Sequence, residues 1–195
     1  MQRILAFDGH PAPGSLSGAL IDAYAEGARE AGREVVVMRL SDMRFDPDFG
    51  AAAYTDAPSL EPDLEAFLAA FEGAEHIVMA CPLWWGGWPA KLKGLFDRVL
   101  LPGRGFDPRD PHWTGLPKPL MTGRSASLMV TSDTPNWAFR LVYAHAFRKI
   151  MARQVFGFVG IRPMRWRNFA IARQASPETV ARWIETARAD GRKGR

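Results

Sequence analysis

The segment that decides the fold runs from residue 81 to residue 98 and reads Cys81-Pro82-Leu83-Trp84-Trp85-Gly86-Gly87-Trp88-Pro89-Ala90-Lys91-Leu92-Lys93-Gly94-Leu95-Phe96-Asp97-Arg98. The apolar run before it, residues 76–80, predicts a buried strand. After it, Pro89 suits the first position of a helix, and Leu92, Phe96 and Val99 recur at helical spacing. The tryptophan-rich part is therefore predicted to be a strand-to-helix loop, at the edge where open α/β sheets place ligands.

The aromatic content of this loop is unusual, because connections run over the surface and normally carry small polar side chains. Trp84, Trp85 and Trp88 stand on either side of Gly86 and Gly87. Large flat side chains beside a flexible backbone suit a planar ligand that needs apolar walls and nearby backbone N–H donors. The alternative is that the tryptophans fill the core or a subunit interface.

A second loop, residues 8–17, follows a predicted first strand at residues 3–7 and opens a helix. Ser15 or Ser17 is the expected N-cap. The first N–H groups of a helix have no partner within it, and the helix dipole favours negative charge there, so the loop is a candidate anion site. The sequence has neither a Gly-x-Gly-x-x-Gly motif nor a Walker lysine, which excludes those two phosphate-binding fingerprints.

Strands and helices are predicted to alternate along the whole chain. Further strands are expected at residues 34–40, 76–80, 125–131 and from 156 to 172, with helices at 61–71, 137–155 and from 177 onward. Right-handed crossovers then give an α/β fold with five parallel strands in the order 2-1-3-4-5. In this order the first and third strands are neighbours, so the serine loop and the tryptophan loop should meet.

Length and composition predict a single domain over residues 1–195, with a basic tail that frays from about residue 189. No run reaches the roughly 18–20 apolar residues of a membrane span, and the N-terminus does not resemble a signal peptide. A lone cysteine, Cys81, excludes an intramolecular disulfide. We therefore expect a cytoplasmic protein that does not insert into a membrane.

The formal net charge of +4 comes with scattered arginines and no nucleic-acid-binding motif. We therefore expect no nucleic-acid partner. The pattern predicts no metal site either.

The tryptophan loop resembles the flavin-binding loop of the flavodoxin-like NAD(P)H:quinone oxidoreductases. The residues that match are Pro82, Leu83, Trp84, Pro89, Ala90, Leu92, Lys93, Gly94, Asp97, Arg98 and Val99. The first loop resembles the family's phosphate loop, with matches at His10, Pro11, Ser15 and Ser17. A further match to the family lies at residues 158–161.

The resemblance implies a flavodoxin-like three-layer sandwich and a flavoenzyme that passes hydride from NAD(P)H to a quinone-like acceptor by a ping-pong mechanism. It implies FMN, with FAD as the alternative, and a homodimer that covers Trp88 or Trp113. The implied cofactor-binding residues are His10, Ser15, Leu16, Ser17, Pro82, Leu83, Trp84, Trp85, Gly86, Thr131, Ser132 and Asp133.

The chain departs from the family after the predicted fourth strand, where residues 131–135 replace a Thr-Thr-Gly-Gly segment. The family's tyrosine and histidine for proton handling have no match at the expected spacing. Tyr143 and His145 are therefore only weak catalytic candidates, and the catalytic residues stay unassigned. An alternative function is that of a flavin-binding ancillary subunit of a potassium-efflux transporter.

Overall fold

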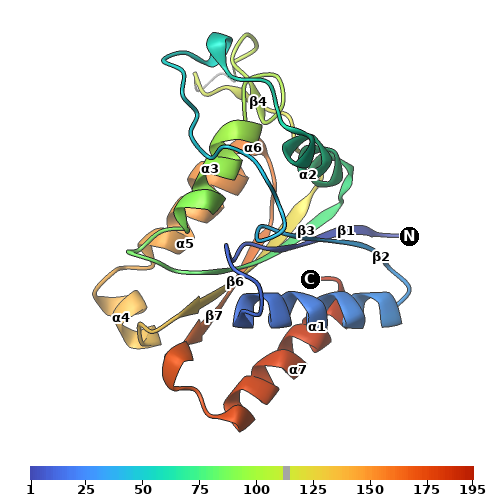
Figure 1. Cartoon of the computed structure of the whole chain (residues 1–195), viewed down its shortest axis with the longest axis vertical. Coiled ribbons are helices and arrows are strands. Elements are labelled where there is room, and N and C mark those ends of the chain that lie inside the picture. The colour runs from blue at the N-terminus through green and yellow to red at the C-terminus, as the bar shows by residue number, and fades with distance from the viewer. Residues whose placement is uncertain (112–114) are drawn as a thin grey trace.

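A five-stranded parallel sheet with helices on both faces forms the centre of the computed structural model, which describes residues 1–111 and 115–195 (Figure 1). The strand order is β2-β1-β3-β6-β7. The bounds are β1 (Arg3–Asp8), β2 (Glu34–Arg39), β3 (His76–Pro82), β6 (Ser125–Ser132) and β7 (Met164–Ala170). This confirms the predicted order, since β6 and β7 are the fourth and fifth strands of the sheet. Two short strands, β4 (Phe106–Asp107) and β5 (Lys118–Pro119), pair separately.

One face of the sheet is covered by α1 (Leu16–Glu30) and α7 (Pro177–Lys193). Side chains that alternate along the strands, such as Ile4 and Val78, pack there against α1. The two helices lie very close together, because a Cβ on Gly27 or Gly191 would overlap the facing backbone. Glycine at these two positions therefore sets the packing distance of this layer.

The opposite face is covered by α2 (Pro62–Gly73) and α3 (Ala90–Val99), with α5 (Ala146–Ile150) and α6 (Phe156–Val159) on the same side (Figure 1). Phe67, Phe71 and Phe96 form a buried aromatic group against the sheet on this side. Two short 3₁₀ helices, η1 (Tyr54–Asp56) and η3 (Ala172–Gln174), lie in connections. Pro89 precedes α3 as its N-cap residue, one position earlier than the sequence pattern predicts.

The helix predicted at residues 137–155 is broken. It consists of α4 (Asn136–Leu141), α5 (Ala146–Ile150) and a π-helical turn at Met151–Val155. Ala144 and His145 separate α4 from α5, with left-handed φ values of 47° and 53°.

The prediction that a strand begins at residue 156 is wrong. Residues 156–159 form the helix α6 (Phe156–Val159), and β7 begins only at Met164. A short apolar run fits a buried helical turn as well as a strand, so periodicity alone does not separate them.

The C-terminal tail differs from the expected frayed segment. Helix α7 continues to Lys193, and Gly191 is buried against the backbone of Tyr24. Arg192 pairs with Glu30 at 2.7 Å and with Glu185 at 3.1 Å. The contacts of Gly191 and Arg192 with α1, and the Arg192–Glu185 pair within α7, hold the last turn in place.

His76, at the start of β3, gives the fold a pH dependence. Its side chain is 1% exposed, and Nδ1 lies 2.8 Å from the Ser125 hydroxyl. Burial, followed by the positive charges of Arg165 and Arg33, lowers its pKa from 6.5 to about 4. The folded protein therefore binds this proton less readily than the unfolded chain does.

We expect the free energy of unfolding to fall as the pH drops from 6.5 towards 4, because the unfolded chain takes up the proton first. The loss attributable to His76 is on the order of 3 kcal/mol. The His76→Asn variant, which keeps a polar partner for Ser125, should lose this part of the slope. Denaturant unfolding at several pH values measures it, and the same slope in both proteins would contradict the assignment.

Candidate functional site

The two predicted ligand loops meet at the carboxyl ends of β1 and β3. The Gly9 N–H donates to the Ala80 carbonyl at 2.7 Å, which carries the pairing of the two strands one residue beyond β1. The imidazole of His10 then meets the indole of Trp84, with ring centroids 5.8 Å apart and planes at 83°. The predicted meeting of loops that are distant in sequence is thus present in the structure.

The amino end of α1 forms the anion-binding half of this site. Ser15 is the N-cap, and its hydroxyl accepts a hydrogen bond from the Gly18 N–H at 3.0 Å. The N–H groups of Leu16 and Ser17 belong to the first turn, where a helix offers them no acceptor. The Ser17 hydroxyl is buried and has no hydrogen-bond partner among the described residues. These free donors suit a phosphate group.

A buried carboxylate, Asp8, lies next to this helix end. Its side chain is 2% exposed, accepts the His10 N–H at 3.0 Å and lies 3.9 Å from the Arg39 guanidinium. Burial raises the pKa of Asp8, against the opposing effects of the His10 hydrogen bond and Arg39. The sequence analysis missed Asp8, although a carboxylate that closes an apolar strand is a usable signal.

His10 is held by its own loop. Its Nδ1 accepts the Ala12 N–H at 3.0 Å and lies 2.9 Å from the Ala12 carbonyl. The ring therefore has a fixed orientation against Trp84 and forms the boundary between the two halves of the site.

The tryptophan loop is a tight turn with two unused donors. Trp84 and Gly87 exchange backbone hydrogen bonds of 3.0 and 2.9 Å. Trp85 and Gly86 between them adopt φ values of 51° and 77°, as a type I′ turn requires. The N–H groups of Trp85 and Gly86 make no hydrogen bond within the described part of the chain. The turn thus presents two free donors beside a fully exposed indole, that of Trp85.

Trp88 has a different role from the other two tryptophans. Its ring packs on Phe96 and Phe147 within the same chain, at centroid distances of 4.6 and 6.3 Å. Trp88 is thus partly buried against the core of its own chain, as the core-filling alternative predicts. Trp113, the other residue expected at a subunit contact, lies outside the described residues.

A cavity of about 410 Å³ lies between the tryptophan turn and helices α4 and α5. Leu83, Phe139 and Phe147 make much of its wall apolar, and Trp85 and Tyr143 also line it. Of the two weak catalytic candidates, the structure thus brings Tyr143 to the site, with its side chain 55% exposed. His145 is not among the lining residues; its N–H donates to the Phe139 carbonyl as part of the helix break.

The third predicted loop, after β6, frames the site. Pro82 and Thr131 are paired in the sheet, and the Leu83 N–H donates to the Thr131 carbonyl at 2.9 Å. Ser132 is 7% exposed. The Asp133 carboxylate accepts the N–H of Arg173 at 2.7 Å, so this side chain fastens the loop to η3. Thr134, the last residue of the polar loop that the sequence analysis expected at the rim of the ring site, lines the cavity.

The arrangement has two properties of a cofactor site, a helix end for an anion and a turn with free donors beside a flat apolar surface. Residues 1–111 and 115–195 contain no group of three or more His, Cys, Asp or Glu side chains placed to hold a metal ion. In the same residues, no helix combines the length and the apolar character of a membrane span.

The profile of the family described as having a flavodoxin-like fold matches residues 2–192. The chain belongs to this family. It is 33% identical over 178 residues to a Ruegeria pomeroyi protein named FMN-dependent NADH:quinone oxidoreductase, covering 83% of this chain and 85% of that protein. It is 30% identical over 122 residues to NAD(P)H dehydrogenase (quinone) 1 of Rattus norvegicus, covering 53% and 44%.

A third relative, a ribosyldihydronicotinamide dehydrogenase-like protein of Penicillium crustosum, is 32% identical over 152 residues. The match covers 66% of this chain but only 57% of the fungal protein. The chain thus spans most of the Ruegeria pomeroyi protein and about half of the length of the rat and Penicillium crustosum proteins.

Solved structures agree on the fold. The NAD(P)H:quinone oxidoreductase of Methanothermobacter marburgensis superposes with a TM-score of 0.82 at 22% identity, covering 98% of this chain and 96% of that one. An FMN-dependent NADH-azoreductase of Bacillus anthracis, solved in complex with FMN, gives 0.72 at 18% identity, covering 99% of both chains. At these identities the matches establish the flavodoxin-like three-layer fold.

Proposed function

We propose that the protein is an FMN-dependent oxidoreductase that passes hydride from NAD(P)H to a quinone or a similar small acceptor. One observation carries this proposal. The loop that leads to the free N–H groups of α1 touches the tryptophan turn with its own free N–H groups, through the contact between the rings of His10 and Trp84. A phosphate-bearing planar cofactor needs both. The relatives named as quinone oxidoreductases support the same reaction class.

Ser15, Leu16 and Ser17 would hold the phosphate of FMN, with the Ser17 hydroxyl gaining the partner that it lacks. Trp84, Trp85 and Gly86 would hold the ring. FMN is favoured over FAD because the sequence offers no second anion loop for an adenylate. When bound, the flavin supplies the two-electron chemistry, and the protein orients it.

The free N–H groups of Trp85 and Gly86 would stabilise negative charge on a bound flavin ring. The apolar wall around Leu83 and Phe139 suits a flat acceptor. Tyr143 is the ionisable side chain among the residues that line the cavity, so we assign proton donation to its hydroxyl. His145 is not part of this assignment, and no observation favours the transporter-subunit alternative.

The first expectation is that purified protein binds FMN. Replacing Ser15 and Ser17 together by alanine should weaken this binding by about 1–3 kcal/mol, because charge-assisted hydrogen bonds to the phosphate are lost. Asp8→Asn should act in the opposite direction, since it removes a buried negative charge beside the same helix end. Titrations that follow flavin fluorescence measure all of these affinities.

Ser176→Ala is the matched control, because the Ser176 hydroxyl caps α7 by accepting the same type of hydrogen bond, from the Thr179 N–H at 3.3 Å, and Ser176 belongs to neither the serine loop nor the tryptophan loop. It should lower stability without changing FMN affinity. The proposal fails if saturating FMN and FAD both leave the melting temperature and the flavin fluorescence unchanged.

The second expectation concerns turnover with NAD(P)H and a benzoquinone. Both substrates must stack on one exposed ring face, so steady-state data should give the parallel double-reciprocal lines of a ping-pong mechanism. Trp85→Ala should lower kcat/KM, because misplacing the reacting atoms by a small distance is costly. Tyr143→Phe should lower kcat by about 10²-fold or more if its hydroxyl supplies the proton.

His145→Gln is the control for these variants and should turn over at the wild-type rate. Intersecting lines for the wild-type enzyme would mean a ternary complex and would rule out the single shared face. An unchanged kcat for Tyr143→Phe would remove the tyrosine from the mechanism while leaving flavin chemistry in place.

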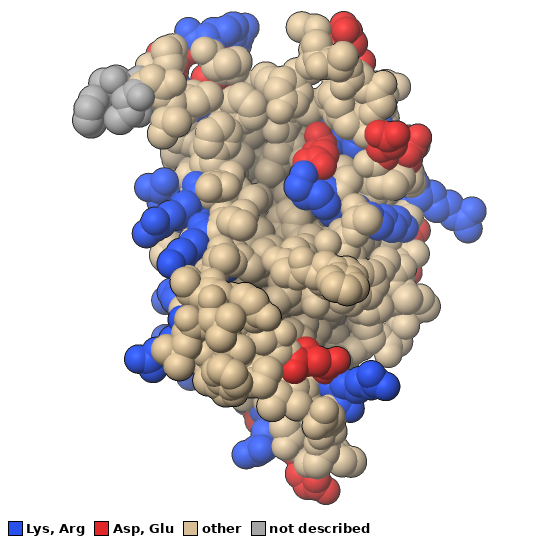
Figure 2. Space-filling model, turned by 90° about the vertical axis from the view of Figure 1, so that its left-hand side faces the viewer, with Lys and Arg blue, Asp and Glu red and all other residues tan. Residues whose placement is uncertain are grey.

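We further propose a two-fold homodimer that covers the surface around α4. Much of the face that carries α4 and α5 is free of charged side chains (Figure 2). The exposed large apolar side chains in this region are Trp85, Trp137, Leu141, Val142, Tyr143 and Ile150. Soluble monomers rarely expose so much contiguous apolar surface. In a two-fold dimer this surface would pack against the same surface of the second subunit, so that both copies are covered.

Light scattering at micromolar concentration should therefore give twice the chain mass of 21.7 kDa. Leu141→Lys, which places a charge on an apolar side chain that is 73% exposed, should shift the protein to the monomer mass. Val36→Lys, on the edge strand β2, is the matched control and should leave the mass unchanged. A monomer mass for the wild-type protein would contradict the dimer.

A further inference from the structure

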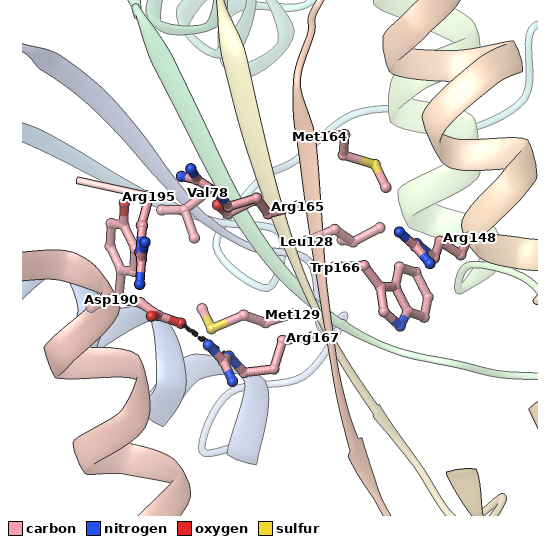
Figure 3. Close-up of a pocket in the computed structure, with 12 residues that line it drawn as sticks. Val78, Leu128, Met129, Arg148, Met164, Arg165, Trp166, Arg167, Asp190 and Arg195 are labelled. Atoms are coloured by element: carbon pink, nitrogen blue, oxygen red, sulfur yellow. Dashed lines mark hydrogen bonds and ion pairs between the residues drawn. The ribbon is translucent and has the colours of Figure 1, made fainter. Parts of the chain in front are cut away.

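A second cavity, of about 360 Å³, opens at the edge strand β7, beside α1 and the end of α7 (Figure 3). It lies toward the amino ends of the strands: Ser127 follows closely on the start of β6, and Arg165 on the start of β7. The proposed flavin site lies at the carboxyl ends of the same parallel strands. The two sites are thus at opposite edges of the sheet.

The lining of this cavity is strongly basic. Four arginines contribute to it, namely Arg148, Arg165, Arg167 and Arg195, against the single carboxylate of Asp190. Arg167 already pairs with Asp190 at 2.6 Å. In Figure 3 the Arg167–Asp190 pair lies on the same side of β7 as Arg165 and Arg195. Arg148 lies on the other side.

Arg165 and Arg195 are exposed and form no ion pair within the described part of the chain. They lie on the same side of β7 as the neutralised Arg167–Asp190 pair (Figure 3). No acidic side chain therefore neutralises the guanidinium groups of Arg165 and Arg195 on that side of the cavity, within the residues that the structure describes.

The wall behind these arginines holds polar groups without partners. The hydroxyls of Tyr24 and Ser127, residues that are 0% and 8% exposed, have no hydrogen bond among the described residues. His76 lies next to Tyr24, with ring centroids 6.4 Å apart, and its Nε2 is also buried and unpaired. Buried polar groups are normally satisfied by protein, water or a ligand, so the two hydroxyls of the cavity lining, and the ring nitrogen beside Tyr24, need an explanation.

We propose that this cavity binds a small phosphate-bearing molecule, with Arg165 and Arg195 on its oxyanion. Guanidinium groups bind phosphate through paired, charge-assisted hydrogen bonds, and the excess of arginine excludes a cationic ligand. The hydroxyls of Tyr24 and Ser127 supply hydrogen-bonding capacity in the wall, directly or through water. Val78 and Met129 offer apolar surface for the organic part of the molecule.

This site is separate from the amino end of α1. Ser17 and Tyr24 are seven residues apart on one helix, which corresponds to a separation of about 10 Å along its axis. The binding of phosphate at the cavity should therefore not depend on Ser15 and Ser17. The inference goes beyond the proposed oxidoreductase activity and does not depend on it.

The test uses inorganic phosphate as the probe, with binding followed by calorimetry and by the NMR signals of the His76 ring. Wild-type protein and the Ser15→Ala/Ser17→Ala variant should both bind, and the His76 signals should move. Arg165→Gln should bind at least about tenfold more weakly, because a charge-assisted hydrogen bond is lost. Arg195→Gln should weaken binding in the same direction.

Arg182→Gln is the matched control, since it removes one positive charge from an exposed position on α7 away from the cavity lining. It should bind phosphate as the wild type does. Acetate tests whether the cavity accepts a carboxylate in place of a phosphate, and it should bind more weakly than phosphate. Melting temperatures of the variants identify any that fail to fold, in which case the other arginine variant decides.

Three outcomes would overturn the proposal. Equal losses in Arg165→Gln and Arg182→Gln would mean nonspecific attraction to a basic protein. Loss of binding in the double serine variant would place the phosphate at the start of α1 instead. Failure of phosphate to bind or to move the His76 signals in the wild-type protein would leave the cavity without its proposed ligand.

Discussion

The parallel pairing of β1 with β3 is the constraint on which the rest of the structure depends. Its last bond, from the Gly9 N–H to the Ala80 carbonyl, brings the turn after β1 against the turn after β3. The crossing is tight, because a Cβ on Gly9 would lie 2.8 Å from the Leu92 side chain and 3.1 Å from Cys81, so a larger residue would force the Leu92 side chain to move. A shift of one residue in this register would turn every side chain of β1 to the opposite face.

Once this register is set, the chemistry of the site at the carboxyl ends of the strands follows from backbone groups that have no hydrogen-bond partner. The start of α1 and the turn at Trp85 and Gly86 both present N–H donors without acceptors, and they lie on either side of the His10–Trp84 contact. The Asp8 carboxylate repels an anion bound at the same place. Its nearest guanidinium, that of Arg39, lies 3.9 Å away and compensates only part of its charge. The affinity of the site for an anion is thus a balance between helix-end donors and one buried carboxylate.

The cavity at the amino ends of the strands differs, because its free polar groups belong to side chains and not to the backbone. These groups are the guanidiniums of Arg165 and Arg195 and the buried hydroxyls of Tyr24 and Ser127. Helix α1 joins the two edges, because Ser15 caps its first turn and Tyr24 reaches the second cavity from its middle. His76, whose pKa is lowered by burial and by the nearby arginines, lies beside Tyr24 at this end of the sheet.

The alternation of strands and helices, the strand order and a serine cap at Ser15 or Ser17 could be predicted from the sequence, because apolar periodicity and cap chemistry are local signals, and the structure selects Ser15. The meeting of the serine and tryptophan loops followed from the strand order. What only the tertiary structure decided was the role of each side chain. Trp88 packs in the core while Trp85 is exposed, and residues 156–159 form a helix where an apolar run suggested a strand. These outcomes depend on long-range packing, which no local pattern encodes.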